Sequence, residues 1–133
     1  MRRISLGAAA VLLAALPLSA ADEADSLPSA LEAGWEGEKV CELRQQTETH
    51  RVLRCTFPPG IGHEKHFHPA HYGFALSGGT MQLTDSRGTR TAVLATGSDY
   101  SSQGTEWHEV VNVGETTVTY LIVEEILGFA ESL

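Results

Sequence analysis

Positive charge is scarce in this sequence of 133 residues, which holds 9 Lys and Arg against 17 Asp and Glu. Two of the nine, Arg2 and Arg3, stand in an N-terminal segment that we expect to be removed. Nucleic acids and anionic membrane surfaces both require a positive protein face, so we expect neither as a partner. The acidic balance does not exclude a small-molecule ligand, because the charge of one pocket can oppose that of the whole chain.

Several signatures of common enzyme classes are also missing. No glycine-rich loop opens a helical segment and no Gly-x-Ser-x-Gly motif occurs, which excludes the usual phosphate-binding loop and the nucleophile elbow of α/β-hydrolases. The two cysteines, Cys41 and Cys55, lack the spacing of a zinc site. The chain has no internal repeat and no low-complexity tract, and its length suits one domain.

Long hydrophobic runs are limited to residues 4–21, an Ala- and Leu-rich stretch that is too short to span a bilayer comfortably. A basic tip precedes this stretch, and small residues end it. The pattern predicts a secretory signal peptide over residues 1–21, cleaved after Ala20 or Ala21, and therefore a periplasmic or secreted protein. No cysteine stands at the junction, so we expect no lipid anchor and no other stable membrane anchor.

Helical periodicity is nearly absent, and only residues 124–133 have a pattern that suits a short helix. Short segments rich in β-branched and aromatic residues alternate with turn clusters. These clusters are Pro58-Pro59-Gly60, Ser77-Gly78-Gly79, Asp85-Ser86-Arg87-Gly88, Thr96-Gly97 and Asn112-Val113-Gly114. We therefore predict an all-β antiparallel sandwich or barrel over residues 37–126. It follows an N-terminal arm over residues 22–36, loose or with one helical turn, and precedes a tail or short helix over residues 127–133.

The two cysteines fit a hairpin. If residues 40–44 and 51–57 pair as antiparallel strands that fold near Glu48, Cys41 and Cys55 lie opposite each other. In an oxidising compartment this placement favours a cross-strand disulfide. The alternative is a pair of reduced, buried thiols that act as small hydrophobic side chains.

Histidines carry the clearest chemical signal. The sequence has six, and four of them, His63, His66, His68 and His71, fall within nine residues. On a strand His66 and His68 point to the same face, so both can bind one ion but cannot complete its coordination. A third ligand must come from another strand, and His108 is the candidate. Imidazole suits iron, zinc, manganese, nickel and copper, so the ligands leave the identity of one divalent transition metal ion open.

The spacing around His66 and His68 resembles the first motif of the cupin superfamily. That motif is Gly, five residues, His-x-His, three residues, Glu, six residues and Gly, and every spacing fits from Gly60 to Gly79. The ligating Glu of the family is replaced here by Tyr72.

A second stretch resembles the second cupin motif, which is Gly, five residues, Pro-x-Gly, two residues, His, three residues and Asn. Gly97, His108 and Asn112 fit, while Gln103 and Thr105 replace the usual Pro and Gly. Together the motifs imply a single-domain, cupin-type antiparallel jelly-roll β-barrel, often a homodimer, with a metal inside its wider mouth.

By position the resemblance implies that His66, His68 and His108 are the metal ligands. Three neutral imidazoles leave a dication with its full charge, so the centre would attract anionic ligands. A free phenol titrates near 10, so we expect Tyr72 as a donor toward metal-bound water or substrate rather than as a ligand. The alternatives are core packing of Tyr72, a fourth ligand from Tyr72, and a fourth ligand from His71 through a bulge after Pro69.

Other residues are assigned by their neighbours. Phe74 and Leu76 share a strand face with Tyr72, so we expect them in the substrate pocket. Glu106 stands two residues before His108 and can enter the same pocket as a ligand or proton acceptor. We expect the remaining histidines, His50 and His63, at the surface. Asn112 is expected to close a turn through its side chain.

These features predict an exported, metal-binding cupin that acts on a small organic molecule. With iron(II) a dioxygenase-like oxidation fits, and with zinc or manganese a lyase or isomerase reaction fits. The alternative is a non-catalytic module that binds a small molecule with or without metal. A third reading is a degenerate cupin whose histidines bind nothing tightly.

Overall fold

The computed structural model describes residues 7, 9–12, 14 and 26–126 of the chain. The predicted tail over residues 127–133 lies outside these residues, as does most of the predicted signal peptide. The described part is all β-structure and contains no α-helix. Accordingly, no helix within it is long and apolar enough to cross a membrane.

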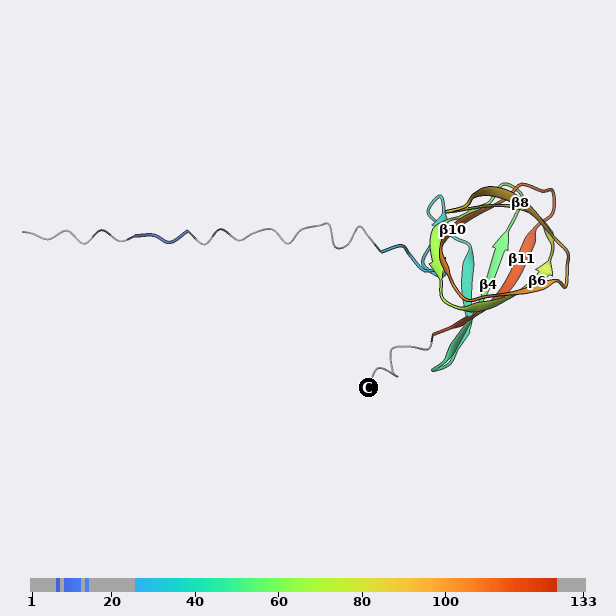
Figure 1. Ribbon diagram of the computed structural model, residues 1–133, viewed down its shortest axis with the longest axis horizontal. Helices are drawn as coiled ribbons and strands as arrows, with labels where there is room; N and C mark the ends of the chain where they lie inside the picture. The colour runs from blue at the N-terminus through green and yellow to red at the C-terminus, as the bar shows by residue number, and fades with distance from the viewer. Residues whose placement is uncertain (1–6, 8, 13, 15–25, 127–133) are drawn as a thin grey trace, which may run out of the picture.

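Two antiparallel sheets face each other and close into a barrel (Figure 1). The strands are β1 (Gly34–Trp35), β2 (Glu38–Lys39), β3 (Cys41–Gln46), β4 (His50–Phe57), β5 (Gly62–His68), β6 (His71–Ser77), β7 (Gly79–Asp85), β8 (Gly88–Leu94), β9 (Asp99–Ser102), β10 (Thr105–Asn112) and β11 (Val118–Glu125). One sheet has the order β5-β10-β7-β8 and the other has the order β3-β4-β11-β6-β9, while β1 and β2 form a separate short pair. The predicted all-β jelly-roll barrel is confirmed.

Strand alternation places the core. On β11, Val118 and Ile122 are buried while the residues between them are partly exposed, as the apolar alternation of this segment favours. Leu53 and Phe57 on β4 pack in the same cluster as Met81 on β7. The helix considered for residues 124–133 is wrong at its start, because β11 continues in register with β4 through Glu125.

A disulfide joins the first hairpin of the barrel. Cys41 and Cys55 are directly opposite each other on β3 and β4, and their sulfur atoms are bonded. Between Leu43 and Gln45 the register shifts by one residue, so a bulge lies between the disulfide and the turn of the hairpin. The bond ties the edge strand β3 to the buried strand β4.

The described part of the N-terminal arm packs on the barrel. The backbone N–H groups of Glu32 and Ala33 both donate to the carbonyl of Ser29, which makes one tight turn. Ala30 within this turn is fully buried. The N–H of Phe67 on β5 donates to the carbonyl of Pro28, so the arm supports the strand that carries two of the histidines.

Asn112 closes the loop between β10 and β11, as expected. Its buried side-chain amide donates to the carbonyls of Phe57 and Thr116, and its Oδ1 accepts from the N–H of Gly114. These bonds tie the end of β10 to the end of β4 and to the loop before β11.

Candidate metal centre

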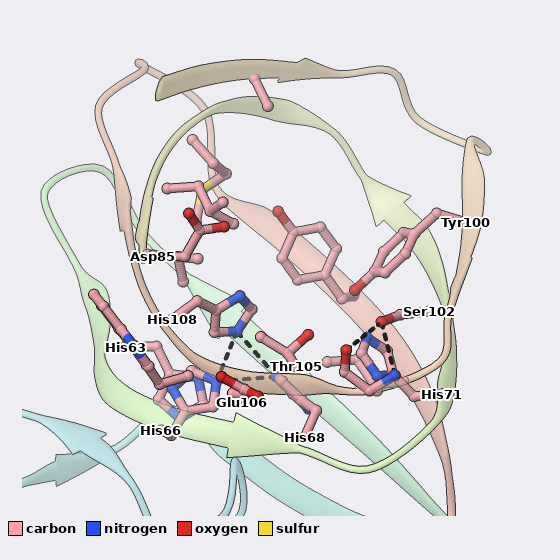
Figure 2. A pocket seen from close by; sticks show the side chains of 18 of the residues that line it. His63, His66, His68, His71, Asp85, Tyr100, Ser102, Thr105, Glu106 and His108 are labelled. Carbon is pink, nitrogen blue, oxygen red and sulfur yellow. Dashed lines mark hydrogen bonds between the residues drawn. The ribbon is translucent and has the colours of Figure 1, made fainter. Parts of the chain in front are cut away.

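Three imidazole nitrogens converge inside the barrel. His66 and His68 come from β5, and His108 comes from the neighbouring strand β10, where it is the direct partner of His66. The Nε2 atom of His66 is 3.0 Å from the Nε2 atoms of both His68 and His108, and the latter two are 3.1 Å apart. Figure 2 shows the three rings turned toward one common point.

The hydrogen-bond acceptors beside the rings indicate that these nitrogens fit a metal ion. The Nδ1 atom of His66 lies 2.6 Å from the carbonyl oxygen of Glu64, so this nitrogen carries the ring hydrogen. The Nδ1 atom of His68 likewise donates to the Glu124 carboxylate, at 2.7 Å. The Nε2 atoms of His66 and His68 therefore face each other as lone pairs. Such a pair repels unless a positive centre lies between the nitrogens, so the donor set suits a cation.

Glu124 orients His68 from behind. This side chain is fully buried, and it bonds both His68 and Arg51. Burial raises the pKa of the Glu124 carboxyl, but the hydrogen bonds from His68 and Arg51 outweigh burial and hold the pKa below its usual range. An ionised carboxylate is thus held behind a candidate ligand, as is common around metal-bound histidines.

Burial keeps the histidines neutral, which is the form that binds a metal. Burial lowers the pKa of His108 from 6.5 to about 3, and the neighbouring His68 and His63 add to this effect. Burial also lowers the pKa of His66, again with help from His63 and His68. In the metal-free protein a proton therefore competes weakly for these two nitrogens.

Tyr72 lies outside the barrel, so the expectation that it faces the metal is wrong. Its side chain is 39% exposed, and its hydroxyl donates to Asp99 at 2.8 Å. The cause is the corner at Pro69 and Ala70, which separates β5 from β6 and changes which residues face inward. His66 and His68 point inward on β5, but His71, Gly73 and Ala75 are the buried residues on β6.

The same corner places the other expected pocket residues of β6 differently. Phe74 and Leu76 share the outer face with Tyr72 and do not line the cavity, so their expected role in substrate binding is wrong. His71 instead points inward and is buried, with its ring centroid 4.6 Å from that of His68. Its Nδ1 atom donates to the carbonyl of Pro69, and the ring stays outside the group of three converging histidines.

His63 is also buried, which overturns its expected place at the surface. It is 2% exposed, and its ring stacks on His66 at 3.7 Å between centroids. The register of β5 against β10 shifts by one residue between the pairs that contain His63 and His66, and this bulge turns both rings inward. The Nε2 atom of His63 has no hydrogen-bond partner among the described residues.

The histidines line a cavity of about 530 Å³ in the mouth of the barrel. Glu106 lines it, as expected, together with apolar residues such as Met81, Leu83 and Val110. Asp85 lies in its wall, with its carboxylate bonded to Arg87 and Arg90. The polar part of the lining also includes Tyr100, Tyr120, Ser102 and Thr105.

Sequence reasoning missed several of these residues. Glu124, Tyr100 and Tyr120 belong to no local motif, so only the closure of the barrel brings them to the histidines. Met81, Leu83 and Asp85 alternate along their segment and so share one face, but the sequence does not show which way that face points. The cavity lining includes Met81, Leu83 and Asp85.

Comparisons with known proteins support the fold. A cupin domain from Bordetella pertussis Tohama I matches with a TM-score of 0.62 and 22% identity, over 77% of this chain and 98% of that one. A Klebsiella pneumoniae protein with a double-stranded β-helix domain matches with a TM-score of 0.56 and 20% identity, over 68% and 78%. A cupin superfamily protein from Desulfitobacterium hafniense matches with a TM-score of 0.52 and 13% identity, over 65% and 76%. No family model and no curated protein matches the sequence.

The topology and the structural neighbours identify the fold of the chain. The closed jelly roll and these structural neighbours show that the chain has the cupin fold, which is the fold that its two motifs imply. Three histidines from the two motif strands form a cluster that can hold a metal ion.

Proposed function

We propose that the protein is an exported cupin that binds one divalent transition metal ion through His66, His68 and His108 and acts on a small organic molecule in the barrel cavity. The proposal rests on the convergence of three Nε2 atoms within 3.0–3.1 Å of one another. The cavity above them has room for a small molecule.

The nitrogen spacing favours an octahedral ion over a tetrahedral one. At a metal–nitrogen distance of about 2.1 Å, tetrahedral ligands lie about 3.4 Å apart, whereas ligands on one face of an octahedron lie about 3.0 Å apart. The observed distances match the octahedral face. Iron(II) there would supply oxygen activation, and zinc or manganese would supply Lewis-acid polarisation. We favour the dioxygenase-like reaction, because three histidines on one face of an octahedron leave three positions, enough for a chelating substrate and O2.

The polar lining favours catalysis over binding alone. A cavity with only apolar walls around the histidines would suit a non-catalytic module. Here Glu106 also lines it, with a carboxyl group that can donate or accept a proton, and the hydroxyls of Tyr100 and Tyr120 can donate hydrogen bonds. The non-catalytic small-molecule-binding module remains the alternative, since fold alone does not decide reaction.

Two features support export. The leader pattern over residues 1–21 is that of a signal peptide. The Cys41–Cys55 disulfide is of a kind that persists in oxidising compartments such as the periplasm.

Cobalt(II) reconstitution tests this proposal. Metal-free protein should take up one equivalent of cobalt with visible absorption bands, and added azide should shift these bands because coordination positions face the cavity. The His108→Ala variant should lose the bands, while His50→Ala, which changes a histidine outside the cavity, should keep them. Absence of cobalt bands in the parent protein would contradict the proposal. Metal-dependent binding of small acids without any turnover would favour the binding module.

A further inference from the structure

Two phenols face the cavity that the histidines share. Tyr100 comes from β9 and Tyr120 from β11, and both line this cavity. Figure 2 shows Tyr100 with its hydroxyl directed into the cavity. Their strands are separate in sequence, so the barrel places both rings on the wall of one cavity.

Neither hydroxyl makes a hydrogen bond within the described part of the chain. Tyr72, on the outer surface, donates to Asp99, but Tyr100 and Tyr120 make no hydrogen bond to any described residue. Tyr100 is 42% exposed and Tyr120 is half-buried, so both side chains are open to the cavity that they line rather than sealed in the core. Two unused donors on a cavity wall therefore suit a ligand with oxygen acceptors.

The fold holds both rings in place. Gly73 on β6 is the direct partner of Tyr100, and a Cβ atom there would lie 2.3 Å from Cε1 of the tyrosine ring. The ring therefore covers Gly73 closely, and its edge packs on His71, with ring centroids 5.6 Å apart. Tyr120 packs against Phe57, with centroids 5.7 Å apart. Binding needs little reorganisation of such preplaced donors.

Both phenols are protonated at neutral pH. Burial raises the pKa of Tyr100, and the nearby Glu124 carboxylate raises it further. Burial also raises the pKa of Tyr120, with a further contribution from Tyr100. The two groups therefore act as hydrogen-bond donors and not as phenolates.

We propose that Tyr100 and Tyr120 form a subsite for the distal oxygen acceptor of the ligand, a carboxylate or carbonyl group, while the near end of the ligand reaches the histidine centre. This inference rests on the proposed metal site and names the ligand class it accepts: a small acid with a second oxygen acceptor. The two arginines near Asp85 are a rival location for that acceptor, and the experiment includes them.

Paired acids test the subsite. Cobalt-loaded protein is titrated with malonate, succinate and glutarate, and with the monoacids of equal carbon number, propionate, butyrate and valerate. At one or more chain lengths the diacid should bind about 10-fold or more tightly than its monoacid, since hydrogen bonds to a charged group contribute about 1.5–3 kcal/mol. The Tyr100→Phe/Tyr120→Phe variant should lose this preference, and Tyr72→Phe, which removes a hydroxyl outside the barrel, should keep it.

A second variant changes the position of the Tyr100 ring and keeps both tyrosine hydroxyls. Gly73→Ala should displace the Tyr100 ring and also reduce the preference. Normal cobalt binding without a diacid preference would overturn the subsite alone. A preference that survives the tyrosine changes but is lost in Arg90→Gln would overturn it in favour of the arginines. Failure of the parent protein to bind cobalt would overturn the metal centre together with the subsite.

Discussion

At the scale of single residues, the centre depends on groups that never touch the proposed ion. The carboxylate of Glu124 fixes the hydrogen of His68 on Nδ1 and leaves Nε2 free to bind. Arg51 compensates the charge of this carboxylate from the other side. Because all three groups are largely buried, loss of one leaves another without its partner.

The Glu124→Gln variant should weaken metal binding about 10- to 100-fold, because an amide holds the His68 ring and its proton less well. A competition titration against a chelator measures this change. Glu125→Gln alters the exposed neighbour on the same strand and should bind metal like the parent protein. Equal affinities in both variants would show that Glu124 does not orient His68.

Acid should destabilise the metal-free protein. The folded-state pKa values of His63 and His108 are lowered by burial from 6.5 to about 4 and about 3. Between these values and 6.5 the unfolded chain binds more protons, so the free energy of unfolding falls as pH falls from about 7 toward 4. Each buried histidine contributes up to about 1.4 kcal/mol per pH unit. Urea unfolding at several pH values measures this slope, which should be shallower in His63→Phe; a pH-independent free energy would contradict the expected burial.

The residues that sequence reasoning placed well are those fixed by spacing alone. His66 and His68 share a face because they are two apart on a strand, and the second motif supplied His108. Tyr72 was misplaced because the sequence reasoning continued the inward and outward alternation of β5 through Pro69 and Ala70 into β6. A corner between two strands does not preserve this alternation. His63 was misplaced because a bulge leaves no mark in a single sequence.

At the scale of elements, hairpins and corners decide what each strand presents to the cavity. The first hairpin was predictable, since Cys41 and Cys55 have matching positions on both sides of its turn. The segment of β11 alternates apolar and polar residues as a strand does, but the sequence pattern suggested a helix from residue 124 onward. Only the pairing of β11 with β4 and β6 shows that Glu124 continues the inward face.

Removal of the disulfide should destabilise the barrel without altering the metal site. The bond closes a loop with a sequence separation of 14 residues, so Cys41→Ala/Cys55→Ala should lower the free energy of unfolding by about 3 kcal/mol. Denaturant unfolding measures this loss, and reductant should destabilise the parent protein but not the variant. An unchanged midpoint in the variant would show that the hairpin needs no covalent link.

At the scale of the whole molecule, a small barrel joins residues that lie far apart in sequence around one cavity. Composition and turn rhythm were enough to predict the all-β class, and the motifs predicted the cupin fold. The cavity wall was not predictable, because it depends on how two sheets close over each other. The expected homodimer stays a prediction that sedimentation of the purified protein can test.

The most direct test of the central claim is the metal content of the protein itself. Protein purified from its export compartment without a histidine tag is compared with the His66→Ala/His108→Ala variant by elemental analysis, with thermal unfolding as a check that both are folded. The account predicts about one equivalent of iron, manganese, zinc, nickel or copper in the parent protein and none in the variant. Equal metal content in both proteins, or no metal in the parent protein even after reconstitution, would contradict it.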